Sequence, residues 1–182
     1  MTILYPLYEN LYVNMTNRCP CACTFCLRQN GEELNGSGSL WLKREPTVEE
    51  VKAEFDKFPP DTYQDLVFCG YGEPTERLED LLEVAAFAKE KFGKKIGVNT
   101  NGLANLMYGK DVTPMFEGKV DAISISLNTP DPKKYLELTR NKFGIDSFDA
   151  MLKFAGDVKR YVPSVTMTTV ATTITEEEED RC

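Results

Sequence analysis

Three cysteines near the N-terminus have the spacing of a loop that binds a metal cluster. Cys19 and Cys23 are separated by three residues, Cys23 and Cys26 by two, and Phe25 directly precedes the last cysteine. Thiolates hold iron–sulfur clusters, and a cubane 4Fe-4S cluster has four irons. Three protein ligands therefore leave one iron free to bind another molecule, and this vacancy is where chemistry can take place.

Cys21 lies inside the same loop and leaves an alternative open. The four cysteines of residues 19–26 are enough for an all-thiolate zinc site, or for a plain electron-carrying cluster. Structural zinc sites usually combine two separate cysteine pairs, however, and the remaining Cys69 and Cys182 are too far apart to form a second pair. The ferredoxin spacing is also missing. The pattern favours three ligands, with Cys21 a bystander, Cys69 a strand-end hydrophobe and Cys182 a terminal thiol.

The composition excludes several classes of function. The 182 residues include no histidine, which removes Ser-His-Asp and Cys-His nucleophiles, histidine-ligated zinc hydrolases and histidine acid–base catalysis. A net charge of −8 disfavours a broad nucleic-acid interface, which needs a clustered basic face. Difficult chemistry in this chain must therefore come from a cofactor.

Length and hydropathy predict one domain in the cytoplasm. A chain of 182 residues, 42% of them hydrophobic, can bury its own core as a single domain over residues 1–182. No apolar stretch approaches the ~18 residues of a membrane span, and Glu9 and Asn10 interrupt the N-terminal segment where a signal peptide would lie. We therefore expect no signal peptide and no membrane contact. The reducing cytoplasm also suits cysteines that serve as metal ligands.

Five short β-rich runs alternate with helical patterns along the chain. Alternation of this kind predicts parallel β/α units. Five strands, or six with a longer C-terminus, are too few for a complete eight-stranded barrel. We therefore expect an α/β fold with a partial, laterally open (β/α)6-type barrel. The runs are residues 11–15, 66–69, 96–98, 122–127 and 165–170.

Capping signals mark the helices between these runs. Thr47 and Glu50 form a capping box, Gly93 ends the next apolar stripe, and Asp131 precedes Pro132 at a helix start. A further stripe follows Ser147. The capping box at residues 175–178 opens a helix that stops at 182, which predicts a truncated C-terminal end. Residues 27–46, directly after the cysteines, are too long for a simple connector and predict a lid or a mobile loop.

Polar motifs follow the runs where the carboxyl ends of parallel strands should meet. The second run leads into Gly-Tyr-Gly-Glu-Pro at residues 70–74, whose glycines allow close backbone approach and whose Glu73 offers acceptors to an ammonium group. The third ends in Asn-Thr-Asn-Gly at residues 99–102. The fourth alternates small polar and apolar side chains as far as Asn128, which predicts one polar face. Arg140 can clamp a carboxylate through its planar guanidinium.

The cysteine motif resembles the hallmark of the radical S-adenosylmethionine (radical SAM) superfamily, in which an aromatic residue precedes the third cysteine. The resemblance implies that Cys19, Cys23 and Cys26 hold a 4Fe-4S cluster and that S-adenosyl-L-methionine binds at the open iron. The strand-end motifs are similar too. Residues 70–74 resemble the Gly-Gly-Glu-Pro motif that binds the methionine amino group, although Tyr71 replaces a glycine.

The same resemblance implies the remaining cofactor contacts. The Thr-Asn-Gly of residues 100–102 lies beside the cofactor in some members, and polar residues at Ser126 and Asn128 reach the ribose or the carboxylate, although an aspartate is more usual at 128. Thr168 and Val170 are expected to wall the adenine. The implied cofactor-binding residues are Phe25, Gly70, Tyr71, Gly72, Glu73, Asn101, Ser126, Asn128 and Arg140. No catalytic residue is assigned beyond the cluster.

The implied function is that of a radical enzyme. A reduced cluster passes one electron to S-adenosylmethionine, and the released 5'-deoxyadenosyl radical abstracts hydrogen from a substrate. The expected partners are a low-potential electron donor, such as flavodoxin or ferredoxin, and a substrate that an open barrel admits, either a small molecule or a peptide. Among family members, the chain looks most like the short TatD-associated radical SAM proteins.

Two other subfamilies remain alternatives on size. The deazaguanine-forming synthase of the queuosine pathway has a similar partial barrel, but there an acid and a magnesium-binding threonine tend to follow the third cysteine, where this chain has Leu27 and Arg28. Magnesium is therefore not predicted. A glycyl-radical activase is the other alternative, and subfamilies with a second cluster fit poorly because too few cysteines remain.

Overall fold

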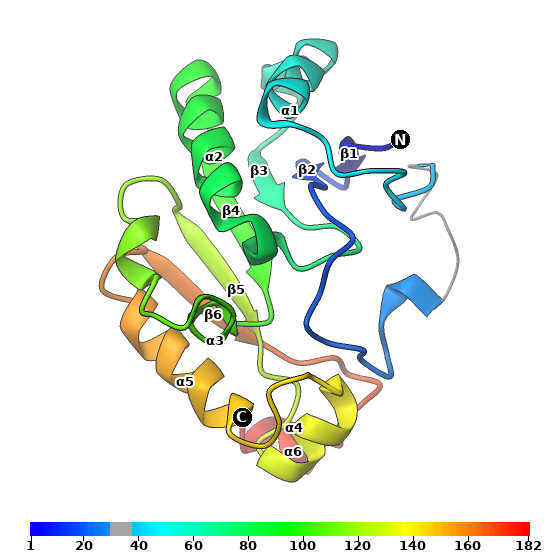
Figure 1. Cartoon of the computed structure of the whole chain (residues 1–182), viewed down its shortest axis with the longest axis vertical. Coiled ribbons are helices and arrows are strands. Elements are labelled where there is room, and N and C mark those ends of the chain that lie inside the picture. Colours follow the sequence, from blue (N-terminus) through cyan, green and yellow to red (C-terminus); the bar gives the residue numbers. More distant parts are fainter. Residues whose placement is uncertain (30–37) are drawn as a thin grey trace.

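A single six-stranded sheet organises the chain, and the computed structural model describes residues 1–29 and 38–182. The strands follow one another in sequence order across the sheet (Figure 1). The first pair is antiparallel, and every later pair is parallel, which confirms the predicted parallel β/α arrangement. The strands are β1 (Leu4–Leu7), β2 (Asn10–Val13), β3 (Asp65–Phe68), β4 (Lys95–Thr100), β5 (Ala122–Ser126) and β6 (Ser164–Thr168).

Strand β1 was not predicted from the sequence. It forms a hairpin with β2 through a tight turn in which Tyr8 takes a positive φ of 53°. Pro6 lies within the strand, and proline is tolerated there because β1 is at the edge of the sheet. The strand that the sheet has in addition to the five predicted ones is thus β1, at the N-terminal end. The sequence pattern instead predicted a further strand after residue 182.

The capping signals correctly mark the helix starts. Thr47 and Glu50 form the reciprocal capping box of α1, Asp131 accepts from the Lys134 N–H at the start of α4, and Gly93 ends α2 with a φ of 63°. No described helix has the length and apolar character needed to cross a bilayer. The helices are α1 (Val48–Glu54), α2 (Leu78–Phe92), α3 (Ala104–Tyr108), α4 (Pro132–Thr139), α5 (Ser147–Val158) and α6 (Glu176–Asp180).

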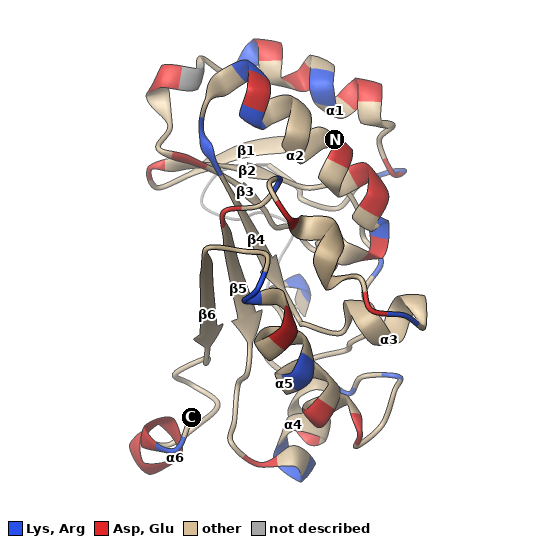
Figure 2. Cartoon of the chain, turned by 90° about the vertical axis from the view of Figure 1, so that its left-hand side faces the viewer, with Lys and Arg blue, Asp and Glu red and all other residues tan. Residues whose placement is uncertain are grey.

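Strand β5 separates the core from the open face of the sheet. Ile123 and Ile125 are buried in the core, whereas Ser124 and Ser126 point to the other face and are only partly buried. Ser126 pairs with Thr168 on β6, so the polar face continues onto the next strand. Helices α1, α2 and α5 gather on the core face, and their charged residues mark its outer side (Figure 2). The predicted polar face of this strand is confirmed.

The predicted lid over residues 27–46 is described only at its two ends, because residues 30–37 lie outside the described chain. Leu40 and Leu42 are buried. The Trp41 ring meets Tyr71 edge to face at 5.3 Å, and the Arg28 guanidinium lies 4.8 Å from the Trp41 ring centroid. The described part of this segment is therefore packed against the turn after β3.

Candidate functional site

The polar strand-end motifs meet in one cavity of about 200 Å³. It lies at the carboxyl edge of the parallel strands, where β/α folds place their working residues. All the implied cluster ligands and cofactor-binding residues line this cavity except Arg140, and Thr168 and Val170, which were expected to wall the adenine, do not line it either. The predicted residues that line it are Cys19, Cys23, Phe25, Cys26, Gly70, Tyr71, Gly72, Glu73, Asn101, Ser126 and Asn128.

Main-chain hydrogen bonds to helix α4 hold the cysteine loop in place. The Ala22 N–H donates to the carbonyl of Thr139 at 2.9 Å, and the Thr24 N–H donates to the carbonyl of Leu138, also at 2.9 Å. The Lys142 N–H returns a bond to the Pro20 carbonyl at 3.0 Å. The last carbonyls of a helix have no partner within the helix. The loop therefore satisfies the C-terminal end of α4 while the helix fixes the loop.

The thiols of the loop lie close together. The thiol of Cys21 is hydrogen-bonded to Cys19 and Cys23, and these bonds lower the pKa of both partners. The pKa of the Cys21 thiol itself is raised, because its hydrogen bonds to Cys19 and Cys23 and its burial both favour the protonated form. The Asn101 Nδ2 also donates to the Cys21 sulfur at 3.8 Å. Cys21, which the sequence treats as a bystander, thus lies within the site.

Gly70 and Gly72 are required for packing against the segment that joins β2 to the cysteine loop. A Cβ on Gly70 would lie 2.1 Å from Asn14 Oδ1, and a Cβ on Gly72 would lie 2.3 Å from the Thr16 carbonyl oxygen. Close approach of these glycines to a ligand stays a prediction. In the structure, they let the turn after β3 lie directly against the chain that leaves β2.

Glu73 is buried and its carboxylate joins two strand-end loops. Its Oε1 accepts from Thr75 N and Oγ1, at 3.1 and 2.7 Å, and from Thr100 Oγ1 at 2.6 Å. Its Oε2 accepts from the Asn101 N–H at 2.7 Å. Burial raises the pKa of Glu73, and the four donors oppose that rise. The carboxylate therefore ties the turn after β3 to the turn after β4, and its oxygens already have donors.

Ser126, the last residue of β5, and Asn128 line the cavity, whereas Arg140 does not. Asn128 is buried and takes a φ of 64°, a conformation that Asn tolerates better than most residues. Strained backbone of this kind concentrates at functional sites. Arg140 is exposed, ends α4 with a φ of 46° and does not line the cavity, so its carboxylate-binding role stays a prediction.

Sequence reasoning missed several residues that line the same cavity. Tyr135 looks like part of the apolar stripe of α4, and its ring does pack against Phe148 at 5.4 Å. Cys69 looks like a strand-end hydrophobe, yet it borders the cavity as well. That these residues line the cavity follows only from their position relative to the cysteine loop, and no local sequence pattern indicates it. The missed residues are Cys69, Tyr135 and Thr139.

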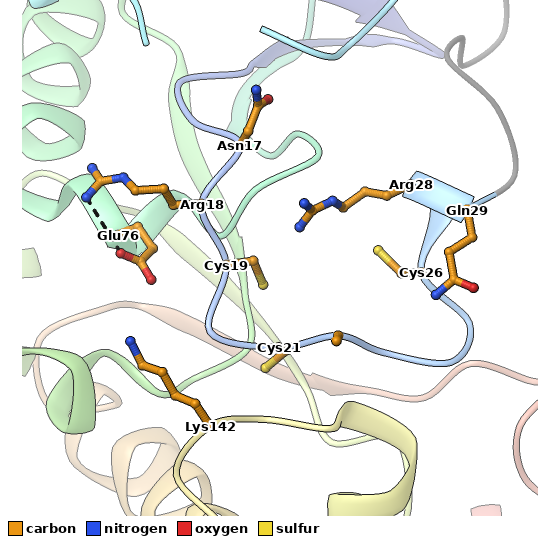
Figure 3. Close-up of a pocket in the computed structure, with 10 residues that line it drawn as sticks. Asn17, Arg18, Cys19, Cys21, Cys26, Arg28, Gln29, Glu76 and Lys142 are labelled. Atoms are coloured by element: carbon orange, nitrogen blue, oxygen red, sulfur yellow. Dashed lines mark ion pairs between the residues drawn. The ribbon is translucent and has the colours of Figure 1, made fainter. Parts of the chain in front are cut away.

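Two further cavities adjoin the first, and Cys26 lines all three. The larger, of about 580 Å³, is enclosed by the cysteine loop and carries Arg18, Arg28 and Lys142 on its walls (Figure 3). Arg18 is paired with Glu45 at 2.7 Å. The other, of about 370 Å³, is mainly apolar and is lined by Phe25, Leu27, Tyr71 and Val170 among others.

A mostly parallel, open β/α sheet with three loop thiols and polar strand ends around one cavity defines a cluster-binding enzyme of the partial-barrel class. A sequence profile of the Radical SAM superfamily matches residues 13–181. The chain belongs to the radical SAM superfamily and is a radical SAM enzyme.

The chain is similar to part of several longer proteins. A GTP 3',8-cyclase of Corynebacterium glutamicum (strain R) is 32% identical over 139 residues, which are 72% of this chain and 34% of that protein. A GTP 3',8-cyclase of Haemophilus influenzae (strain PittGG) is 28% identical over 148 residues, which are 80% of this chain and 40% of that protein. The chain thus spans between 34% and 40% of the length of these two curated relatives.

Solved structures with low sequence identity share the fold. A crystal structure of methylornithine synthase (PylB) superposes with a TM-score of 0.62 at 19% identity, covering 94% of this chain and 47% of that one. A structure of TYW1 with a lysine-pyruvate adduct bound gives a TM-score of 0.59 at 15% identity, covering 97% of this chain and 62% of that one. These likenesses confirm the partial, laterally open barrel.

The family implies a 4Fe-4S cluster and S-adenosylmethionine, and the donor set fits the cluster. Three thiols that are soft ligands for iron border one cavity, and hydrogen bonds lower the pKa of two of them. Within the described chain, no three Cys, Asp or Glu side chains are drawn together around a point that would hold a single metal ion. A buried hydroxyl without a protein partner, that of Tyr135, belongs to the same cavity.

Proposed function

We propose that this chain uses Cys19, Cys23 and Cys26 to hold a 4Fe-4S cluster and reductively cleaves S-adenosylmethionine to abstract hydrogen from a substrate. The observation that carries the proposal is that these three thiols share one cavity with the turn after β3 and the polar end of β5. When bound, the cluster and S-adenosylmethionine supply one-electron cleavage of a carbon–sulfur bond and a radical that takes hydrogen from substrate. The protein supplies position and excludes water.

We assign the cavities of about 200 and 370 Å³ to one molecule of S-adenosylmethionine. The first cavity carries the polar side chains of Glu73, Ser126 and Asn128, which suit the methionine end, whereas the adjoining cavity with Phe25 and Val170 has none of these three and suits the adenine. The two cavities share Cys23, Phe25, Cys26, Gly70 and Tyr71 among their walls, so a long ligand can occupy both. The backbone of residues 70–74 would orient the amino group, since the Glu73 oxygens are engaged within the protein.

We also propose that an acidic one-electron carrier reduces the cluster through the cavity shown in Figure 3. Arg18, Arg28 and Lys142 line that cavity beside Cys19 and Cys26, in a chain whose net charge is −8. Among the described residues, neither Arg28 nor Lys142 forms an ion pair with a carboxylate, so their charges are available to a partner. Local positive charge of this kind steers an acidic protein to the site.

The subgroup and the substrate of this enzyme are separate proposals from its radical chemistry. The resemblance to TatD-associated proteins remains our proposal for the subgroup, and the cyclase relatives offer a purine nucleotide as the first substrate to try. The open side of the barrel can admit either a small molecule or a peptide.

The decisive experiment is anaerobic reconstitution of the chain with iron and sulfide, followed by reduction with dithionite in the presence of S-adenosylmethionine. We expect chromatography to detect 5'-deoxyadenosine from the wild-type chain and none from a variant in which Cys19, Cys23 and Cys26 are replaced by alanine. A fully loaded and reduced cluster that leaves S-adenosylmethionine intact, with and without candidate substrates, would contradict the proposal.

A further inference from the structure

Tyr135 has a buried hydroxyl that no group of the described chain satisfies. The residue is fully buried on α4, and its hydroxyl lacks any hydrogen-bond partner. Buried hydroxyls are nearly always hydrogen-bonded, because leaving one unpaired costs about 1–3 kcal/mol. Asn14 Oδ1 is the other such atom in the described chain, and an unpaired carbonyl acceptor is less unusual than an unpaired donor. The Tyr135 hydroxyl therefore requires an explanation.

Tyr135 lies on the side of the cavity that the loop cysteines form. Tyr135 lines the same cavity as Cys21 and Cys23, and the charges of these thiols add to burial in raising its pKa. Its ring is fixed by an edge-to-face contact with Phe148 at 5.4 Å. The backbone of the same helix holds the cysteine loop at Ala22. The hydroxyl and the loop thiols are thus held by one rigid element.

Protein groups near the hydroxyl are engaged elsewhere. The Glu73 carboxylate has four donors of its own, from Thr75, Thr100 and Asn101. The Cys21 thiol is hydrogen-bonded to the neighbouring cysteines. Among the described residues, no acceptor lies within hydrogen-bond distance of the Tyr135 hydroxyl, and an iron–sulfur cluster held by the loop would bring anionic sulfur into this cavity.

We infer that the Tyr135 hydroxyl donates a hydrogen bond to anionic sulfur at the cluster site, either the Cys23 thiolate or a sulfide of the cluster. This rests on the proposed function, and it makes Tyr135 a residue that sets the reduction potential. Hydrogen bonds to cluster sulfurs help to set that potential. Reduction makes the sulfurs more negative, so a donor stabilises the reduced form more than the oxidised form and raises the potential.

The test compares the reconstituted wild-type chain with Tyr135→Phe, and Tyr63→Phe serves as the matched control. Tyr63 packs on Phe58 just before β3, at the opposite end of the strands from the cavity. Three quantities are measured: the midpoint potential of the cluster by spectroscopically monitored titration, the affinity for S-adenosylmethionine by calorimetry, and the stability of the cluster-free chain. For Tyr135→Phe we expect the equilibrium constant for one-electron reduction of the cluster to fall by up to tenfold. This corresponds to a midpoint potential that is about 59 mV more negative.

The other two readouts separate this role from its rivals. We expect the affinity of Tyr135→Phe for S-adenosylmethionine to stay within twofold of wild type, and the cluster-free variant to be at least as stable, since an unpaired hydroxyl has been removed. An unchanged potential overturns the inference, and so does a loss of affinity alone, which would assign the hydroxyl to the cofactor. A destabilised cluster-free variant would show a structural partner instead. A wild-type chain that assembles no cluster would contradict the proposed function itself.

Discussion

The carbonyl oxygen of Thr139 accepts a hydrogen bond from the backbone N–H of Ala22 at 2.9 Å. Thr139 ends α4, and Ala22 lies between two proposed cluster ligands. Together with the bond from Thr24 to Leu138, this contact joins the cysteine loop to the helix that follows β5. The position of the thiols therefore depends on the C-terminal turn of α4 and on the residues that stabilise it.

Asn141 is the side chain that stabilises this turn, and we expect Asn141→Ala to weaken it. Its Nδ2 donates to Thr139 Oγ1 at 3.0 Å and to Ser147 Oγ at 2.8 Å, and its Oδ1 accepts from the Phe143 N–H at 3.0 Å. Losing buried hydrogen bonds and leaving partners unpaired should lower the free energy of unfolding by about 2–4 kcal/mol. Denaturant unfolding measures this, with exposed Lys133→Ala as control. A loss below about 0.5 kcal/mol, the range of surface substitutions, would contradict the assigned role.

Gly72→Ala should separate the turn after β3 from the cysteine loop. The new Cβ would lie 2.3 Å from the Thr16 carbonyl oxygen and 2.7 Å from that of Arg18, and backbone atoms cannot move aside cheaply. We expect a large loss of stability and of iron bound after reconstitution. The matched control is Gly156→Ala, because a Cβ on Gly156 meets open space on helix α5 and should be neutral or stabilise by up to about 1 kcal/mol. Equal behaviour of the two variants would show that the contact does not matter.

Glu73 should give stability a distinctive pH dependence. Burial raises its pKa, so between the ordinary carboxyl value and the raised one the folded chain binds more protons than the unfolded chain. The contribution of Glu73 to stability therefore falls as the pH rises through that interval, and Glu73→Gln removes this part of the dependence. Denaturant unfolding of both proteins from about pH 4 to 8 measures it. A wild-type advantage that grows with pH would instead show that the four donors dominate.

Single cysteine variants should separate the three ligands from Cys21. Cys21 is hydrogen-bonded to Cys19 and Cys23 but is the one predicted to be outside the ligand set. After anaerobic reconstitution, we expect Cys23→Ala to lose most of its iron and its cluster absorption, whereas Cys21→Ala should keep both. Iron and sulfide analysis provides the readout. Equal losses from both variants would mean that Cys21 is a ligand and that the cluster has no open iron.

Charge reversal at Lys142 should slow reduction by a protein donor. Lys142 is exposed and lines the cavity enclosed by the cysteine loop, and only its backbone N–H bonds that loop. For Lys142→Glu we expect slower reduction by reduced flavodoxin at low ionic strength, with the difference shrinking as salt screens the charges. Reduction by photoreduced deazaflavin should be unchanged. Lys133→Glu, at an exposed position at the start of α4, is the control, and an equal effect there would exclude a local docking site.

The sequence predicts the parts of this chain whose signals are local. The capping box at Thr47 and the αL stop at Gly93 mark helix ends because they depend on residues within one turn. The alternation along β5 predicts its polar face, because successive strand residues point to opposite sides. Strand β1 escaped prediction because Pro6 and a turn at Tyr8 weaken its pattern, and only the pairing with β2 makes it a strand.

The site residues that escaped prediction depend on distant contacts. Nothing within α4 distinguishes Tyr135 from a core aromatic, and its role follows from the approach of the cysteine loop more than 100 residues earlier. The packing role of Gly72 escaped prediction, because the backbone that crowds it belongs to the segment after β2. Glu73 likewise binds donors from the loop after β4, which no spacing around residue 73 indicates.

The bonds between the cysteine loop and α4 also bear on how this chain can diversify. They use backbone atoms only, and Ala22 and Thr24 expose their side chains to solvent. Every residue except proline carries the same N–H donor, so mutations at these two positions leave the anchoring bonds available. The outer surface of the loop is thus free to drift toward new electron carriers over evolutionary time, while the arrangement of the thiols beneath it is inherited unchanged.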